Sequence, residues 1–367
     1  MSSYPKEVPR FERRFFAAAN TSAGFKSDYP LCFGEGSGIE RLYVIKGGPG
    51  TGKSHLMRRI GRSAEALGYL VTYYYCSSDP ASLDGVRMEA NGKPCIGVLD
   101  GTAPHVWEPL QPGVKEELVN LGEFWNSRRL REHSREIKDL SREKSRYYHM
   151  AYGYLHACGE VTAIVDTLVA PCVLDKKLTS LAGRLLKSQP SGICFSETPA
   201  HRACIGMTGR QSFDTYEKMA EAAGGEVLEI DECYGLGYEL TSRLYRTSRE
   251  MRLRIFVSRH PIHSHKIDGL YYPDTGLCFS VCQHDPSAPL RRRILLQRYL
   301  NKPLFKSIRG EVRHGIKLAE EMTEGACRAL RSAGTAHFAL EDLYASSMDF
   351  NAKEKHDAAL CERIFGE

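Results

Sequence analysis

The segment Glu40-Arg-Leu-Tyr-Val-Ile-Lys-Gly-Gly-Pro-Gly-Thr-Gly-Lys-Ser54 places a glycine-rich stretch between two regular elements. Before it, Leu42 to Ile45 is an apolar run typical of a strand. After it, apolar residues recur at helical spacing, at Leu56, Ile60 and Ala64. A strand, a GxxxxGK[ST] loop and a helix in this order are the context of a phosphate-binding loop. The segment therefore predicts an α/β protein with the P-loop NTPase fold.

Each residue type in this loop has a chemical reason. Glycines adopt backbone angles that other residues avoid, and they let backbone amides approach phosphate oxygens. Lys53 is expected to bridge the β- and γ-phosphates and to act in catalysis, while the Ser54 hydroxyl coordinates Mg²⁺. The expected ligand is a nucleoside triphosphate, ATP with Mg²⁺. The predicted nucleotide-binding residues are Gly48, Pro49, Gly50, Thr51, Gly52, Lys53, Ser54 and His55.

A carboxylate for Mg²⁺ is expected at the end of another apolar strand. The segment Cys95 to Asp100 fits, so Asp100 is predicted to be a catalytic residue and a Mg²⁺ carboxylate. Its alternative is an ordinary strand-end Asp that caps a turn. Gly101 follows in place of the second acid found in many ATPase motors, which leaves the water-orienting residue unassigned.

Other polar side chains follow predicted strands and are candidates for the same crevice. Asp79 and Asp84 come after the strand-like run Leu70 to Tyr75. Carboxyl ends of strands line the ligand crevice in doubly wound sheets, so either carboxylate is a candidate for positioning water or metal. Asx-turn chemistry is the alternative. His105 lies on another such loop, where a lone His is more often structural.

The two halves of the chain resemble each other at an offset of about 185 residues, and such an internal repeat favours a duplicated domain. In this alignment Gly50 and Gly52 meet Gly235 and Gly237. Lys53, Ser54 and Asp100 meet Tyr238, Glu239 and Cys282. Asp84-Gly85 meets Asp268-Gly269. We therefore expect two tandem α/β lobes, with an intact site in the first and a degenerate, acidic pseudo-site in the second; the alternative is an unrelated second α/β domain.

The predicted domains are residues 1–185, an NTPase lobe with a helical insertion, and residues 186–367, a degenerate lobe with a helical C-terminal tail. Residues 112–168 have the pattern of long helices. Mixed charges from Ser127 to Arg146 indicate a solvated helix face, with a basic lid over the nucleotide as the alternative. The cluster His260, His263 and His265 lacks a zinc-ligand spacing.

Composition limits the partners. The 367 residues carry a net charge of +5, which permits acidic partners without indicating nucleic acid. No run approaches the ~18 consecutive apolar residues of a membrane span, and the start of the chain has no apolar signal core. Twelve scattered cysteines without a CxxC pair favour reduced thiols. A cytoplasmic location is expected, and the protein partner is left open.

Several segments together resemble a bacterial family of two-lobed, tandem P-loop ATPases. They are residues 46–54, Cys76-Ser-Ser-Asp-Pro-Ala-Ser-Leu-Asp-Gly85, Leu99-Asp-Gly-Thr-Ala-Pro-His105 and Leu343-Tyr-Ala-Ser-Ser-Met-Asp-Phe350. The resemblance implies ATP binding and supports Lys53, Ser54 and Asp100. Family members carry a P-loop in each half, and this chain departs from them in the second.

We therefore expect a Mg²⁺-dependent ATPase with one competent site, in which hydrolysis changes how the lobes pack. A kinase of a nucleotide or small molecule is a second hypothesis, motivated by the arginines between residues 128 and 146. A nucleotide-dependent adaptor with little turnover is a third, motivated by the missing acid after Asp100.

Overall fold

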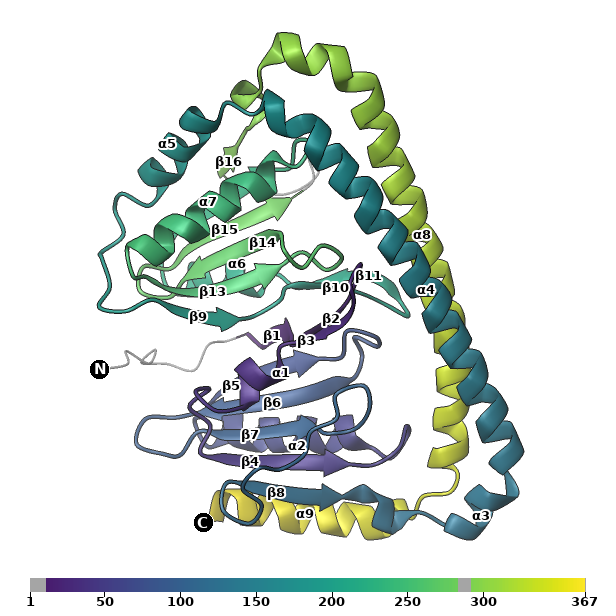
Figure 1. The fold of residues 1–367 in the computed structure, drawn as a ribbon. Helices are drawn as coiled ribbons and strands as arrows, with labels where there is room; N and C mark the ends of the chain where they lie inside the picture. The colour runs from purple at the N-terminus through teal and green to yellow at the C-terminus, as the bar shows by residue number, and fades with distance from the viewer. Residues whose placement is uncertain (1–10, 283–291, 367) are drawn as a thin grey trace.

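The computed structural model describes residues 11–282 and 292–366. These residues form two α/β lobes stacked on one another, with two long helices running along one side of both (Figure 1). The predicted boundary after residue 185 falls between α5 (Asp175–Leu185) and β9 (Ser196–Pro199), where one strand-and-helix series ends and the next begins.

The first lobe is built on a six-stranded mixed sheet among the described residues. Its order is β1 (Arg13–Phe16), β5 (Leu70–Tyr75), β6 (Leu83–Glu89), β7 (Ile96–Asp100), β4 (Arg41–Lys46) and β8 (Glu116–Asn120). β4 is parallel to β7 and β8, whereas β6 is antiparallel to both neighbours. Leu42 to Ile45 are all buried, which explains the unbroken apolar run in this central strand. Helix α2 (Lys53–Ala66) packs its apolar stripe on one face.

The second lobe repeats this sheet strand for strand. Its order is β9, β13 (Arg254–Arg259), β14 (Ile267–Tyr272), β15 (Leu277–Cys282), β12 (Val227–Asp231) and β16 (Arg292–Ile294). The parallel and antiparallel neighbours also correspond. Each lobe adds a hairpin, a short helix and a helix after its central strand: β2 (Ala18–Thr21), β3 (Gly24–Ser27), α1 (Tyr29–Phe33) and α2 in one; β10 (Ala203–Gly206), β11 (Gly209–Ser212), α6 (Thr215–Ala222) and α7 (Leu236–Glu250) in the other. This match supports the internal repeat.

Two strands differ from the sequence expectation. Asp84, which was expected in the polar segment after the strand-like run Leu70 to Tyr75, instead lies in β6, which runs antiparallel inside the sheet. The helical pattern predicted from residue 112 begins with β8 and the short helices η1 (Leu121–Phe124) and α3 (Ser127–Glu132). Polar residues interrupt both strands, so their hydrophobic pattern is weak.

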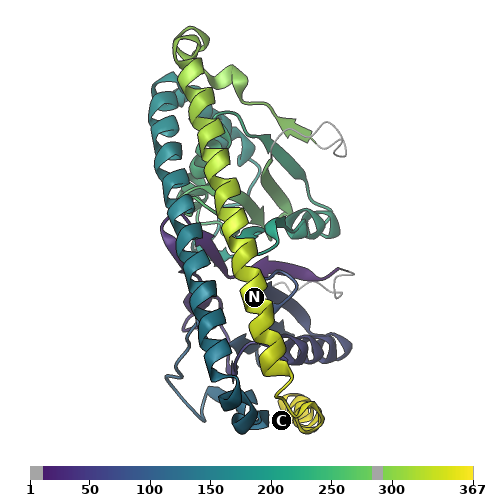
Figure 2. The same cartoon turned by 90° about the vertical axis from the view of Figure 1, so that its right-hand side faces the viewer.

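The spine of the molecule is an antiparallel pair of helices, α4 (Ser134–Val169) and α8 (Lys302–Ala345). Figure 2 shows them side by side along both lobes. Small and apolar residues close their interface, including Ala151, Leu155, Ala326 and Leu330. Charged residues between Ser127 and Arg146 mostly face solvent and pair locally, as Arg142 does with Asp139, which fits the predicted solvated face.

The helices that follow the spine are exchanged between the lobes. After α4 and η2 (Ala170–Cys172), α5 packs on α7 of the second lobe, where Leu178 and Ala182 join its core. After α8, α9 (Phe350–Gly366) packs on α2 of the first lobe, where Leu360 and Ile364 join that core. η3 (Gln297–Tyr299) precedes α8. Residues 1–185 and 186–367 are therefore repeats in sequence, whereas each lobe in space contains helices from both.

The remaining expectations concern thiols and membranes. All twelve cysteines are free and most are buried, in agreement with the prediction. Among the described residues, no helix combines the length and apolar character needed to cross a bilayer.

We predict that Leu155→Ala destabilises the protein by about 2–5 kcal/mol, because this fully buried side chain lies at the α4–α8 contact and its loss leaves a cavity. Denaturant unfolding measures the effect. Met150→Ala is the matched control on the same helix, since Met150 is 45% exposed and should cost little. Equal losses in the two variants would contradict the assigned packing.

Candidate functional site

The loop between β4 and α2 has the backbone geometry that an anion site needs. Gly50 and Gly52 have φ of 67° and 79°, the left-handed region that favours glycine. Gly52 is the residue before α2, and no side chain caps the first turn of that helix. The amides at the start of α2 thus keep hydrogen-bonding capacity beside the positive end of the helix dipole.

Lys53 and Asp100 lie together at the end of the sheet. The Lys53 Nζ donates to the carbonyls of Gly47 at 3.2 Å and Gly48 at 2.7 Å, and it lies 3.5 Å from Asp100 Oδ2. Asp100 reaches this place because β7 pairs in parallel with β4, with Asp100 opposite Ile45. Burial raises the pKa of Asp100, while Lys53 opposes that shift. The Asp100 Oδ1 accepts a hydrogen bond from the Thr102 amide at 2.9 Å. The same carboxylate therefore stabilises the turn after β7 with one oxygen and faces Lys53 with the other.

The side chains of the other predicted loop residues point to different parts of the structure. The Thr51 Oγ1 donates to the Gly48 carbonyl at 2.9 Å and shapes the loop. The Ser54 hydroxyl oxygen accepts from the Leu83 amide at 2.9 Å, which ties the loop to the start of β6.

His55 is exposed and lies beside Glu354 and Asp357 of α9. Arg59 and Lys353 already pair with those two carboxylates, which reduces their attraction for a metal ion.

The three crevice candidates take different positions. The Asp79 carboxylate accepts from the Ala81 amide at 3.2 Å, which is the Asx-turn alternative. Asp84 is 5% exposed and lies 3.1 Å from His105 Nε2, which is also buried. The negative charge of Asp84 contributes to the raised pKa of Asp100. Asp84 is thus the candidate that neighbours the Lys53–Asp100 pair.

Residues from the far end of the chain cover the loop. A Cβ at Gly48 would meet the Tyr344 ring at 3.1 Å, and one at Gly52 would meet Lys353 Cε at 2.8 Å. A Cβ at Gly50 would clash with the Glu341 carbonyl. Burial raises the pKa of the Glu341 carboxyl, whereas the Gly50 amide and Lys53 oppose the rise, so this side chain also faces the loop. Of these three residues, only Tyr344 lies in a segment that carries the family resemblance, Leu343 to Phe350.

The second-lobe loop is two residues shorter, which corrects the sequence alignment. Ile45 and Ile230 hold matching places, each facing the core under α2 or α7. The left-handed residue before the helix is Gly52 in one lobe and Gly235, with φ 89°, in the other. Leu236 and Gly237 therefore take the places of Lys53 and Ser54; the assignments to Tyr238 and Glu239 were wrong.

The place of the metal carboxylate is corrected in the same way. Ile45 pairs with Asp100 in the first sheet, and Ile230 pairs with Val281 in the second. Val281 also packs toward the core under α7. The counterpart of Asp100 is thus Val281 rather than Cys282. The second loop has neither a lysine nor a hydroxyl nor a metal carboxylate at the three matching positions.

Glu232 fills the second loop with its own negative charge. Its carboxylate accepts hydrogen bonds from the amides of Gly235 and Gly237, the latter at 3.1 Å. These are the amides that would otherwise face an anion at the start of α7. Burial raises the pKa of Glu232 to about 7, against the opposing effect of the two amides and Lys266. A side chain of the loop itself therefore satisfies the amides at the start of α7.

No family model, no curated protein and no solved structure matches this chain. The resemblance to tandem P-loop ATPases stays a prediction, carried by the residues described above.

We predict that Glu232→Gln flattens the dependence of stability on pH. Because the folded-state pKa of about 7 lies above the ordinary 4.5, the folded chain holds this proton more tightly. The resulting stability is complete below pH 4.5 and is lost as the pH rises through 7. Denaturant unfolding between those values should show the wild type losing stability relative to the variant. Glu250→Gln, at the exposed end of α7, should keep the wild-type slope; an unchanged slope in Glu232→Gln would contradict the assignment.

Proposed function

We propose that this protein is a P-loop NTPase that binds ATP with Mg²⁺ at Gly47–Ser54 and hydrolyses it. The observation that carries the proposal is the 3.5 Å approach of Lys53 to Asp100 beside an uncapped helix start. This arrangement sets a cation for phosphate, a buried carboxylate for metal and free amides at one end of a sheet, which is where α/β folds bind ligands.

The residues present fit the expected ligand. The amides from Gly50 to Ser54 would bind phosphate oxygens, and Lys53 would exchange its loop carbonyls for the β- and γ-phosphates. Ser54 and Asp100 would hold Mg²⁺, which neutralises phosphate charge when bound. The buried Asp84–His105 pair is the nearest candidate for orienting water, since no acid follows Asp100.

A switch function is supported by the contacts on the loop. Glu341 and Tyr344 of α8 and Lys353 of α9 all belong to the second repeat, yet they lie against the first-lobe loop. Phosphates entering that loop would have to share its amides with Glu341. Nucleotide binding is thus coupled to the position of α8 and α9, which supports a nucleotide-dependent change in lobe packing. The same contacts also suit an adaptor with little turnover.

The kinase alternative gains no support from the charged stretch. Its Arg128 and Arg142 side chains are 88% and 79% exposed and pair with acids on their own helices. Within that stretch, Lys144 has a charge interaction with Glu341 beside the loop. We therefore retain ATP hydrolysis as the proposed activity.

We predict that Lys53→Ala weakens ATP binding by at least about tenfold, because it removes a charge-assisted contact to phosphate. Asp100→Asn should instead remove most of the dependence on Mg²⁺ and lower phosphate release. Calorimetric titration with and without Mg²⁺, and a phosphate-release assay, measure these effects. Lys187→Ala removes an exposed lysine between the repeats and is the control. ATP binding that is the same in all variants would overturn the site, whereas binding without release would leave the adaptor.

We predict that Glu341→Gln tightens ATP binding several-fold. The carboxylate lies near Lys53 and the Gly50 amide, where it repels phosphate and competes for the same donors. The control is Glu324→Gln, on the exposed face of the same helix. The measurement is the ATP dissociation constant at low and physiological salt. Weaker binding in Glu341→Gln than in the control would show that Glu341 supports nucleotide rather than competing with it.

A further inference from the structure

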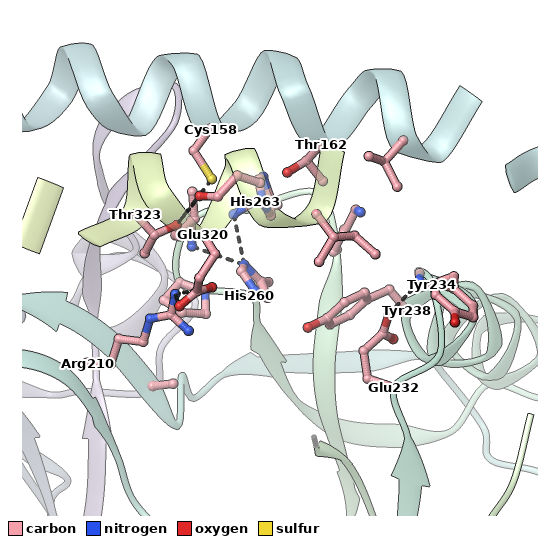
Figure 3. Close-up of a pocket in the computed structure, with 18 of the residues that line it drawn as sticks. Cys158, Thr162, Arg210, Glu232, Tyr234, Tyr238, His260, His263, Glu320 and Thr323 are labelled. Carbon is pink, nitrogen blue, oxygen red and sulfur yellow. Dashed lines mark hydrogen bonds and ion pairs between the residues drawn. The ribbon is translucent and has the colours of Figure 1, made fainter. Parts of the chain in front are cut away.

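A cavity of about 820 Å³ lies between the second-lobe loop and the two spine helices. Its volume is in the range of sites that hold drug-sized molecules. The loop that ends β12, the segment after β13, and α4 and α8 all contribute walls. Figure 3 shows Tyr238 and His260 from the second lobe facing the same space as Thr162 of α4 and Glu320 of α8.

The cavity lies beside the second-lobe loop, which corresponds to the proposed nucleotide loop of the first lobe. The residues of this second loop nevertheless disfavour phosphate. The amides of Gly235 and Gly237 are already engaged by Glu232. A phosphate group would have to displace this buried carboxylate or lie against it. Like charges at such distances repel strongly in a site of low dielectric constant.

The charge of the lining also disfavours anions. Its acids are Asp166, Asp231, Glu232 and Glu320, and its bases are Arg210 and Lys266. Arg210 donates to both carboxylate oxygens of Glu320 at 2.8 Å. Lys266 pairs with Asp166 at 2.6 Å. Arg210 and Lys266 are therefore held in ion pairs, which leaves Asp231 and Glu232 outside the ion pairs of this described lining. Glu232, with a pKa of about 7, is only partly ionised at neutral pH, and Asp231 also interacts with Arg293 beside the cavity, so the surplus of negative charge is modest.

The histidines add no positive charge. The His260 Nδ1 accepts from the amides of Ile262 and His263, each at 3.1 Å, so its ring proton lies on Nε2. Burial lowers the pKa of His260 and brings that of His263 to about 3, and Lys266 adds to both shifts. Both rings are neutral at pH 7. His260 therefore offers a ring edge and one N–H donor.

Apolar and aromatic residues form part of the wall, beside polar ones such as Thr162, Gln211 and Gln297. The Tyr238 ring meets His260 edge-on at 5.3 Å between centroids. Val165, Ile262 and Ile316 supply aliphatic surface. A ligand that buries a flat ring here would gain hydrophobic and aromatic contacts. A cationic group on that ligand would be attracted by the carboxylates of Asp231 and Glu232 in the lining.

We propose that this cavity binds a small organic cation with a flat apolar body, and that the second lobe has become a receptor for such a molecule. The ligand would touch α4 through Thr162 and α8 through Glu320. The other end of α8 covers the first-lobe loop. A ligand that contacts α8 in the cavity would therefore influence the position of α8 at that loop. Binding itself does not depend on the proposed ATPase activity.

The test uses full-length protein carrying Lys53→Ala, so that the first-lobe loop contributes no anion binding. Tryptamine is the probe, 3-indolepropionate is its anionic match with the same ring system, and inorganic pyrophosphate represents phosphate ligands. Calorimetric titration should show saturable one-site binding of tryptamine, and at least roughly tenfold weaker binding of the other two, because their charge is repelled. No tryptamine binding at millimolar concentration, or tighter binding of either anion, would overturn the proposal.

Two variants locate the site. Thr162→Phe fills the cavity from α4 and should abolish tryptamine binding. Asp231→Asn removes one surplus charge and should weaken binding roughly tenfold, the usual worth of a charge-assisted contact. Glu250→Gln removes an exposed carboxylate at the far end of α7 and should leave binding unchanged. If Thr162→Phe does not fold, Asp231→Asn decides: binding equal to that of Glu250→Gln would place tryptamine elsewhere and refute the assignment.

Discussion

The packing of α4 against α8 is the constraint on which the rest of the structure depends. Each helix leaves one lobe, runs along the spine and delivers a terminal helix to the other lobe. α9 covers α2 with Leu360 and Ile364, and α5 covers α7 with Leu178 and Ala182. Neither lobe has a closed hydrophobic core without the other repeat. The spine therefore fixes both the lobe arrangement and which residues can reach the two loops.

The two loops answer the same physical problem in opposite ways. A helix that begins after a left-handed glycine leaves amides that attract an anion. In the first lobe these amides stay uncapped, with Lys53 and Asp100 beside them. In the second lobe Glu232 satisfies the amides from within the chain. The backbone architecture survives in both, so the difference in chemistry comes from a few side chains and a loop shortened by two residues.

Local sequence was enough to predict the parts of the first site that are close in the chain. β4, the glycine loop and α2 follow from a continuous apolar run, a spacing motif and a helical stripe. Asp100 followed from a second buried strand. The order of repeat elements was also visible, because Asp268-Gly269 matches Asp84-Gly85. The alignment was wrong at the second loop, because Gly235 and Gly237 have the same spacing as Gly50 and Gly52. Spacing alone does not reveal that the second loop is two residues shorter.

The remaining features depend on tertiary contacts that no local pattern records. β6 and β8 are partly polar, and pairing with their neighbours in the sheet makes them strands. Glu341 and Lys353 are separated from the loop by nearly 300 positions. The second-lobe cavity exists because α4 and α8 pass over a loop to which neither is adjacent in sequence. Placing them requires the exchange of helices between repeats.

This exchange changes what a mutation in the second half means. The second lobe has Leu236 and Val281 at the positions of Lys53 and Asp100, yet the same half of the chain supplies α9 to the core beneath the first-lobe loop. Substitutions in α9 can therefore disturb the first-lobe loop from the second repeat. A lesion in α9 and a lesion in Lys53 should fall into one genetic class, although they lie in opposite halves of the gene.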